Sequence, residues 1–121
     1  MKKKFPIILL CLFIGVSACA PKGGVLRPAK PGQAIFEKAE QKFSRSLYAE
    51  ARNLYKQYVK KHPDAEKVPA AKLKLGMIHA AQKKFDPARE MYVEVIARYP
   101  DTPQAATARI KIMERSEEHT S

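Results

Sequence analysis

From Gln33 onward, apolar residues recur at the three- and four-residue spacing that places them on one face of an α-helix. The first apolar stripe consists of Ala34, Ile35, Ala39 and Phe43, and most charged residues of that segment lie elsewhere. The same spacing predicts helices at about residues 33–45, 48–61, 69–82, 86–98 and 103–114. No segment shows the sustained alternation of a strand, so the predicted fold class is all-α.

Helix starts are predicted from capping residues and prolines. Asp86 is expected to be the N-cap of the fourth helix, with Pro87 as its first residue, and the fifth helix is expected to begin near Thr102 or Pro103. The inward-facing residues predicted for the later helices are Ala51, Leu54, Tyr55, Tyr58, Val59, Ala71, Leu73, Leu75, Ile78, Ala88, Met91, Tyr92, Val95, Ile96, Ala105, Ala108, Ile110 and Ile112.

The chain contains an internal repeat with a period of 37 residues. The pattern of Tyr48–Tyr55 returns in Phe85–Tyr92, and the triplet His62–Asp64 returns as Tyr99–Asp101. A period between about 20 and 50 residues is typical of a solenoid, in which each repeat packs on its neighbours. The repeat therefore predicts a short helical solenoid.

The repeated residues resemble the tetratricopeptide repeat. Leu75 and Gly76 match its Leu-Gly pair, Ala88 its small residue, Tyr92 its aromatic residue and Pro100 its closing proline. The earlier repeat has Ala39 at the position of Gly76, and His79 stands where an aromatic residue is usual. The resemblance covers residues 33 to about 113 and implies a helical hairpin solenoid of about two and a half repeats, cut short at its C-terminal end. The resemblance also implies that the residues matched to the motif serve the packing of the helices.

The N-terminal segment has the build of a secretory signal peptide. A basic start is followed by ten mostly apolar residues, 7–16, too few to span a bilayer comfortably. The following Val16–Cys19 resembles a bacterial lipobox, which implies a signal peptide over residues 1–18 and lipidation of Cys19 with a diacylglyceryl thioether and an amide-linked acyl chain. The alternative is an ordinary cleavage site with an incidental thiol. Ala20, in place of the aspartate that retains enteric lipoproteins in the inner membrane, favours the outer membrane.

Residues 19–32 are rich in proline and glycine and have almost no apolar periodicity, so they are expected to form a tether. The chain carries a formal net charge of +11, but no aromatic residues are interleaved with a basic cluster as in nucleic-acid modules. We therefore expect no nucleic-acid partner. Binding of the basic repeats to an anionic polymer is a third hypothesis, and it predicts a steep loss of affinity with salt.

The residues that could perform chemistry are isolated from partners. With Cys11 removed and Cys19 lipidated, no cysteine remains for a disulfide or a metal, and His62 and His79 have no metal-ligand spacing. Ser44 and Ser46 lack the arrangement of a catalytic nucleophile. The sequence therefore predicts no enzyme activity, no cofactor, no metal site and no small-molecule substrate.

Residues 115–121 break the apolar pattern and match the translation of a common sequencing adapter, so they are expected not to be natural protein. The natural chain is then expected to continue beyond Glu114, leaving the fifth helix without its partner. Because solenoid repeats are stabilised by their neighbours, this chain is expected to be helical but marginally stable.

The combined layout resembles tetratricopeptide lipoproteins of the Gram-negative envelope, in particular the BamD-like lipoproteins of the outer-membrane β-barrel assembly machine. That resemblance implies an outer-membrane lipoprotein that faces the periplasm and docks envelope proteins or peptides. The alternative is the repeat region of a lipoprotein that activates peptidoglycan synthesis, or of a Tol-Pal-associated division factor, with its effector domain lost. Predicted partner-binding residues on the first helices of the hairpins are Lys42, Lys72, His79 and Lys83.

Overall fold

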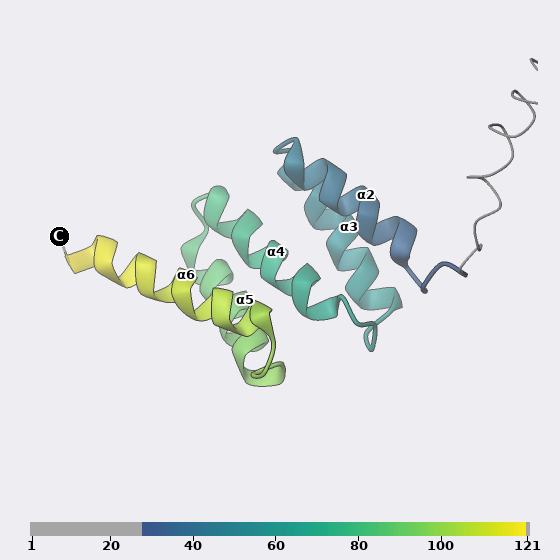
Figure 1. The fold of residues 1–121 in the computed structure, drawn as a ribbon. Helices are drawn as coiled ribbons and strands as arrows, with labels where there is room; N and C mark the ends of the chain where they lie inside the picture. The colour runs from purple at the N-terminus through teal and green to yellow at the C-terminus, as the bar shows by residue number, and fades with distance from the viewer. Residues whose placement is uncertain (1–27, 121) are drawn as a thin grey trace, which may run out of the picture.

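A computed structural model describes residues 28–120, and all of its regular structure in this range is helical. The helices are α2 (Gln33–Ser44), α3 (Tyr48–Lys61), α4 (Val68–Ala81), α5 (Phe85–Arg98) and α6 (Pro103–Thr120) (Figure 1). Helices adjacent in the sequence pack against each other, and α4 also contacts α6. The fold is therefore two successive helical hairpins, α2–α3 and α4–α5, followed by one further helix, as the sequence predicts.

The turn inside each hairpin is built in the same way, 37 residues apart. Ser46 and Lys83 both adopt the left-handed conformation, with φ of 59° and 63°. The next amide in each case reaches back five residues, from Leu47 to the Lys42 carbonyl at 2.9 Å and from Lys84 to the His79 carbonyl at 2.8 Å. This is the Schellman arrangement that satisfies the last carbonyls of a helix. The repeated sequence thus ends α2 and α4 with one geometry.

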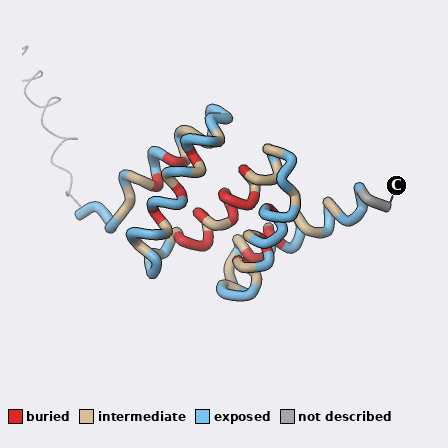
Figure 2. Tube along the Cα trace, turned by 180° about the vertical axis from the view of Figure 1, so that it is seen from behind, coloured by how far each residue is buried: buried red, intermediate tan, exposed pale blue. Residues whose placement is uncertain are grey.

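Helix α4 lies between two hydrophobic clusters and contributes to both. Its Ala71, Leu75 and Ile78 pack with α2 and α3, whereas Leu73 packs with α5 and α6. Figure 2 shows buried residues along most of this helix, in contrast to the exposed outer sides of its neighbours. No residue of α4 from 68 to 80 is exposed, so α4 is the interior helix of the domain, although it carries Lys72, Lys74 and His79.

The second hairpin closes around Gly76, as predicted for a packing position. A β-carbon built on Gly76 would lie 2.6 Å from Tyr92 Cε1 and 2.8 Å from its Cδ1. The aromatic ring of α5 therefore rests directly on the backbone of α4, which no larger residue at position 76 would allow without displacement. In the first hairpin, the fully buried Ala39 occupies the position 37 residues earlier.

Most predicted inward-facing residues are buried or half-buried, but the register of α2 differs from the prediction. The buried residues of α2 are Phe36 and Ala39, and Ala34 is exposed. Ala34, Ile35 and Phe36 are consecutive apolar residues, so the pattern alone leaves the phase of the helix open. The larger ring of Phe36 takes the interior position because it packs on Tyr55 and Tyr58, with ring centroids 5.8 and 5.3 Å away.

The helix ends also differ from the predictions. Helix α5 begins at Phe85 after the N-cap Lys84, so the expectation that Asp86 is its N-cap is wrong. Helix α6 continues to Thr120, beyond the predicted end at residue 114, and Ile110 on this helix is 49% exposed. The apolar pattern is missing after Glu114 because the helix buries no apolar face there. A helix can continue without such a face. The origin of residues 115–121 stays a prediction.

Thr102 caps the start of α6, and its removal should destabilise the domain. The Ala105 amide donates to Thr102 Oγ1 at 3.2 Å, and the Thr102 hydroxyl donates to the Tyr99 carbonyl at 2.7 Å. We expect Thr102→Ala to lower the free energy of unfolding by about 1 kcal/mol, measured by urea unfolding followed by circular dichroism. Thr107→Ala is the matched control, because its exposed hydroxyl donates only to the Pro103 carbonyl inside the helix. Equal effects of the two substitutions would contradict the capping role.

Candidate functional site

Two of the four predicted partner-binding residues, Lys42 and Lys72, are engaged in ion pairs within the domain. Lys42 Nζ lies 2.6 Å from a carboxylate oxygen of Glu50 on α3. Lys72 on α4 pairs with Glu94 on α5, and the Lys72 side chain is only 12% exposed. Glu94 also receives the Arg98 guanidinium, at 3.4 Å. Both lysines thus join the two helices of a hairpin, and their role in partner binding stays a prediction.

The other two predicted residues, His79 and Lys83, lie at the C-terminal end of α4. Lys83 is exposed in the left-handed turn position. His79 is half-buried, and its Nδ1 atom is buried without a hydrogen-bond partner among the described residues. Burial lowers the pKa of His79, and the nearby charges of Arg52, Lys84 and Lys56 lower it further. The imidazole therefore lies in a positively charged environment.

We call Arg52, Lys56, His79 and Lys84 the His79 cluster. Arg52 and Lys56 lie one turn apart on the same face of α3, and α3 packs on α4. Lys84 is held beside His79 by the hydrogen bond between their backbones. None of the ion pairs found within residues 28–118 includes a member of this cluster. His79 is among the residues predicted from the sequence, whereas Arg52, Lys56 and Lys84 are not.

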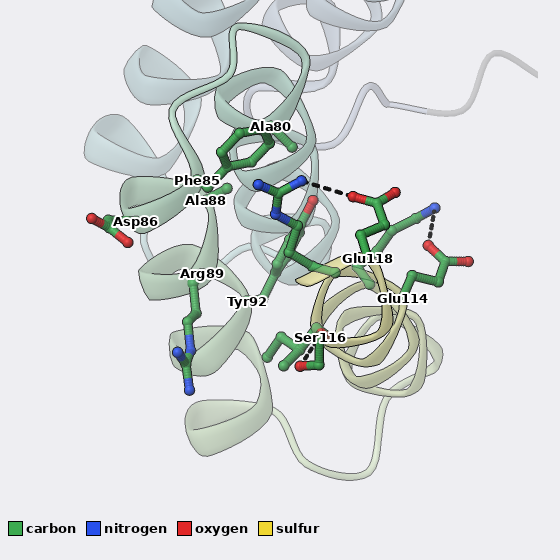
Figure 3. A pocket seen from close by; sticks show the side chains of 12 residues that line it. Ala80, Phe85, Asp86, Ala88, Arg89, Tyr92, Glu114, Ser116 and Glu118 are labelled. Carbon is green, nitrogen blue, oxygen red and sulfur yellow. Dashed lines mark hydrogen bonds and ion pairs between the residues drawn. The ribbon is translucent and has the colours of Figure 1, made fainter. Parts of the chain in front are cut away.

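A hollow of about 290 Å³ lies between the start of α5 and the end of α6. Phe85 and Tyr92 of α5 and Ser116 and Glu118 of α6 are among the residues that line it, as Figure 3 shows. The Arg115 guanidinium stacks on the Phe85 ring, 3.5 Å from its centroid, and pairs with Glu118 at 2.7 Å. Because this wall belongs to the segment predicted not to be natural protein, we do not place the functional site in this hollow.

The family of the chain follows from comparison with known protein families. Residues 42–112, more than half of the chain, match the model of the tetratricopeptide repeat. This chain belongs to the tetratricopeptide repeat family. The comparison with curated proteins found no match.

Membership in the tetratricopeptide repeat family indicates a protein–protein interaction scaffold, because repeats of this family mediate such interactions and are typically non-catalytic. The tetratricopeptide residues themselves form the packing. Leu75, Gly76, Ala88 and Tyr92 are all buried, so they hold the hairpin together and are not available to a partner. Surface residues must therefore provide the specificity of this tetratricopeptide domain.

Neither a metal site nor a membrane-spanning helix is found among the described residues of the tetratricopeptide domain. Within it, no three His, Cys, Asp or Glu side chains gather in a way that could hold a metal ion. None of its helices is both long and apolar enough to cross a membrane. Cys19 and residues 1–18 lie outside the described residues, as does most of the predicted tether 19–32.

The end of the predicted tether contacts the first tetratricopeptide hairpin. Lys30 forms an ion pair with Glu66 in the turn between α3 and α4, and this interaction raises the pKa of Lys30 and lowers that of Glu66. Gly32 has a φ of 77°, and a β-carbon there would lie 2.4 Å from His62 Cδ2. The chain therefore enters the domain along the turn between α3 and α4.

Proposed function

We propose that this chain is a lipid-anchored protein–protein interaction scaffold of the Gram-negative cell envelope, held at the outer membrane and facing the periplasm. The observation that carries the proposal is the lipobox-like Val16–Cys19, followed by a short tether and tetratricopeptide repeats. One acyl chain gives only reversible membrane binding, whereas two or more give stable anchoring. A lipidated Cys19 would thus keep the interaction surface at the membrane. Outer-membrane protein assembly is the process that we propose it serves.

The tether sets how far the repeats can stand from the membrane. An extended chain spans at most about 3.5 Å per residue, so residues 19–32 would reach roughly 45 Å. The contacts of Lys30 with Glu66 and of Gly32 with His62 fix the last part of this segment against the domain. The scaffold would therefore work close to the membrane, with the turn between α3 and α4 on the side of the anchor.

Replacement of Cys19 tests the anchor directly. We expect Cys19→Ser, made in the full chain and expressed in a Gram-negative host, to abolish incorporation of radiolabelled palmitate. The same variant should move from the membrane fraction to the soluble periplasmic fraction, because position 19 then has no thiol to accept the diacylglyceryl group. The measurements are labelling followed by gel electrophoresis, and separation of inner and outer membranes on a density gradient.

Cys11→Ser is the matched control, because Cys11 lies in the segment predicted to be removed. This variant should retain both the label and the outer-membrane position. An unlabelled wild-type chain, or a Cys19→Ser chain that still takes up palmitate, would contradict the lipid anchor. Labelled protein in the inner membrane would contradict only the outer-membrane assignment.

A second candidate function concerns what covers the exposed apolar residues of α6. Ile110 and Met113 lie one turn apart and are 49% and 57% exposed. A further helix packed on this side would cover them, as α5 covers α4. Such a cover is compatible with both functions, and we propose as the alternative that these repeats are the N-terminal region of a longer lipoprotein that activates peptidoglycan synthesis, or of a Tol-Pal-associated division factor. The downstream reading frame separates the two: further helical repeats favour the scaffold, and an alternating strand–helix region favours the alternative.

A further inference from the structure

Residues 30–32, which we call the entry segment, lead the chain from the predicted tether into α2. The Gln33 amide donates to the Lys30 carbonyl at 3.0 Å, and the Lys30 amide donates to Gln33 Oε1 at 3.2 Å. The Gly32 carbonyl accepts from the Phe36 amide in the first turn of α2, also at 3.0 Å. The backbone of the entry segment is therefore tied to the start of α2.

Two contacts hold the entry segment against the end of α3 and the turn between α3 and α4. Lys30 Nζ pairs with Glu66 in that turn. Gly32 has a φ of 77°, and a β-carbon built on it would lie 2.8 Å from Tyr58 Cε2 and nearer still to His62 Cδ2. Both aromatic rings thus rest on the glycine backbone. The left-handed conformation and the close approach each require glycine at this position.

The second hairpin enters its first helix in a different way. Val68 and Pro69, which lie 37 residues after Pro31 and Gly32, are both buried, and Val68 belongs to the first hydrophobic cluster. Pro31 is exposed, and Gly32 is half-buried. The entry segment therefore lacks the apolar burial that fixes the chain at the start of α4.

The contacts of the entry segment are weak enough to be released. The Lys30 and Glu66 side chains are 67% and 72% exposed, and an ion pair between such exposed groups shifts an equilibrium about fivefold at most. A hollow of about 490 Å³ is lined by Lys30 and Pro31, by Tyr58 and by residues of the turn between α3 and α4. Part of the entry segment therefore borders open space and is not close-packed against the domain.

We propose that the entry segment is a conformational latch, closed when Lys30 and Gly32 lie against the turn between α3 and α4 and open when this contact is released. In the closed form the tether leaves the domain at residue 29 in one fixed direction. In the open form the folded domain pivots on the tether at the start of α2. The latch is a regulatory element because a small change in ionic conditions or in contacts at Glu66 shifts its equilibrium.

The closed latch would set the orientation of the scaffold, an inference that rests on the proposed anchor at Cys19. The turns inside the two hairpins, at Ser46 and Lys83, lie at the opposite end of the helices from the turn between α3 and α4 (Figure 1). A closed latch therefore directs these hairpin turns away from the anchor. An open latch removes that constraint.

Replacement of Gly32 tests the fit of the latch. Order parameters of backbone amides, from ¹⁵N relaxation of the full chain in detergent, report motion on the picosecond to nanosecond timescale. We expect a value near 0.85 for the Lys30 amide of the wild type and a value below about 0.6 in Gly32→Ala, because the added methyl group meets the two rings and alanine disfavours this φ. Gly24→Ala makes the same change earlier in the predicted tether, and this matched control should keep the wild-type value.

Exchange of the two charges tests the ion pair of the latch. Glu66→Lys places two cations together and should lower the order parameter of the amide at position 30. Lys30→Glu/Glu66→Lys restores opposite charges and should restore that order parameter. A merely structural role of either side chain would not be rescued by the exchange.

Carbodiimide cross-linking measures the closed form independently, because it joins an amine to a carboxylate only when the two groups are in contact. The initial yield of the Lys30–Glu66 amide, quantified by peptide mass spectrometry, should fall about two- to fivefold between 0.1 M and 1 M NaCl, where the Debye length shortens from about 10 to about 3 Å. Lys72 and Glu94, whose side chains are only 12% and 28% exposed, are the internal reference. Their yield should change less.

Several results would overturn the latch. They are a mobile Lys30 amide in the wild type, equal order parameters in Gly32→Ala and Gly24→Ala, no rescue by the charge exchange, or a Lys30–Glu66 yield that salt leaves unchanged. Circular dichroism shows whether each variant is folded, and the charge variants, at exposed positions, decide if Gly32→Ala is not. None of these measurements depends on lipidation, so failure of the latch is distinguishable from failure of palmitate labelling.

Discussion

Tyr55→Ala is expected to lower the free energy of unfolding by about 4 kcal/mol, the typical cost of truncating a fully buried aromatic residue. Tyr55 is 0% exposed. Its ring packs edge-on against Phe36 and Phe43, with centroids 5.8 and 6.5 Å away. Its hydroxyl donates a hydrogen bond to Glu40. Small domains have only about 5–15 kcal/mol of stability in total, so this variant should be largely unfolded under mild denaturing conditions.

Tyr55→Phe separates the ring from the hydroxyl and serves as the control. It keeps the aromatic contacts and removes the hydrogen bond to Glu40, so we expect a loss of about 1 kcal/mol. Glu40 would retain Lys74, whose Nζ is 3.7 Å from its other carboxylate oxygen. Urea unfolding of the chain from residue 19 onward, followed by far-ultraviolet circular dichroism, measures both losses. If Tyr55→Ala cost no more than Tyr55→Phe, the ring would not hold α2 and α3 together as described.

Gly76→Val is expected to destabilise the domain by about 3 kcal/mol, at the upper end of the cost of overpacking a core. Any side chain at this position meets the Tyr92 ring, which lies 2.6 Å from an added β-carbon. Tyr92 is 5% exposed and has little space in which to move. Valine has the better intrinsic helix propensity, by a few tenths of a kcal/mol, so propensity alone predicts a small gain. The sign of the measured change in the free energy of unfolding decides between the two effects.

A double-mutant cycle tests the named contact. In a Tyr92→Leu background the ring is absent, and the penalty for Gly76→Val should fall below about 1 kcal/mol. The free energies of unfolding of the four proteins, again from urea denaturation, give the coupling between positions 76 and 92. An unchanged penalty in the Tyr92→Leu background would show that the strain at Gly76 arises elsewhere.

Helix positions followed from the sequence because local signals and packing agree in this domain. Helix α3 runs from Tyr48 to Lys61 as predicted, and the later hairpin repeats it 37 residues on. The inward-facing side of α2 could not be predicted in this way. Ala34, Ile35 and Phe36 are consecutive apolar residues, and only packing against the aromatic rings of α3 decides which of them is buried. The end of α6 did not follow either, since apolar periodicity reports a buried face and not the helix itself.

The candidate site was only partly predictable, for a physical reason that differs from residue to residue. The pairing of Lys72 with Glu94 joins positions 22 residues apart, and no local pattern reveals it. Lys42 and His79 looked alike as exposed polar positions, although one has a carboxylate beside it and the other has three cations. Comparison of Glu50 with Pro87 across the repeat is the one sequence signal that could have pointed to the difference.

The place of α4 between two clusters has a consequence for cooperativity. Its Ile78 and Leu73 belong to different clusters, so melting of α4 would remove part of both. In repeat proteins, stability is a sum of the intrinsic terms of the repeats and the interface terms between neighbours. Here the interface term is carried largely by α4, whose last turn contains His79. Stabilisation of α4 would therefore stabilise both hairpins together, and mechanical load applied at one hairpin would reach the other through α4 and through Met91 and Tyr99, which also pack against the first cluster.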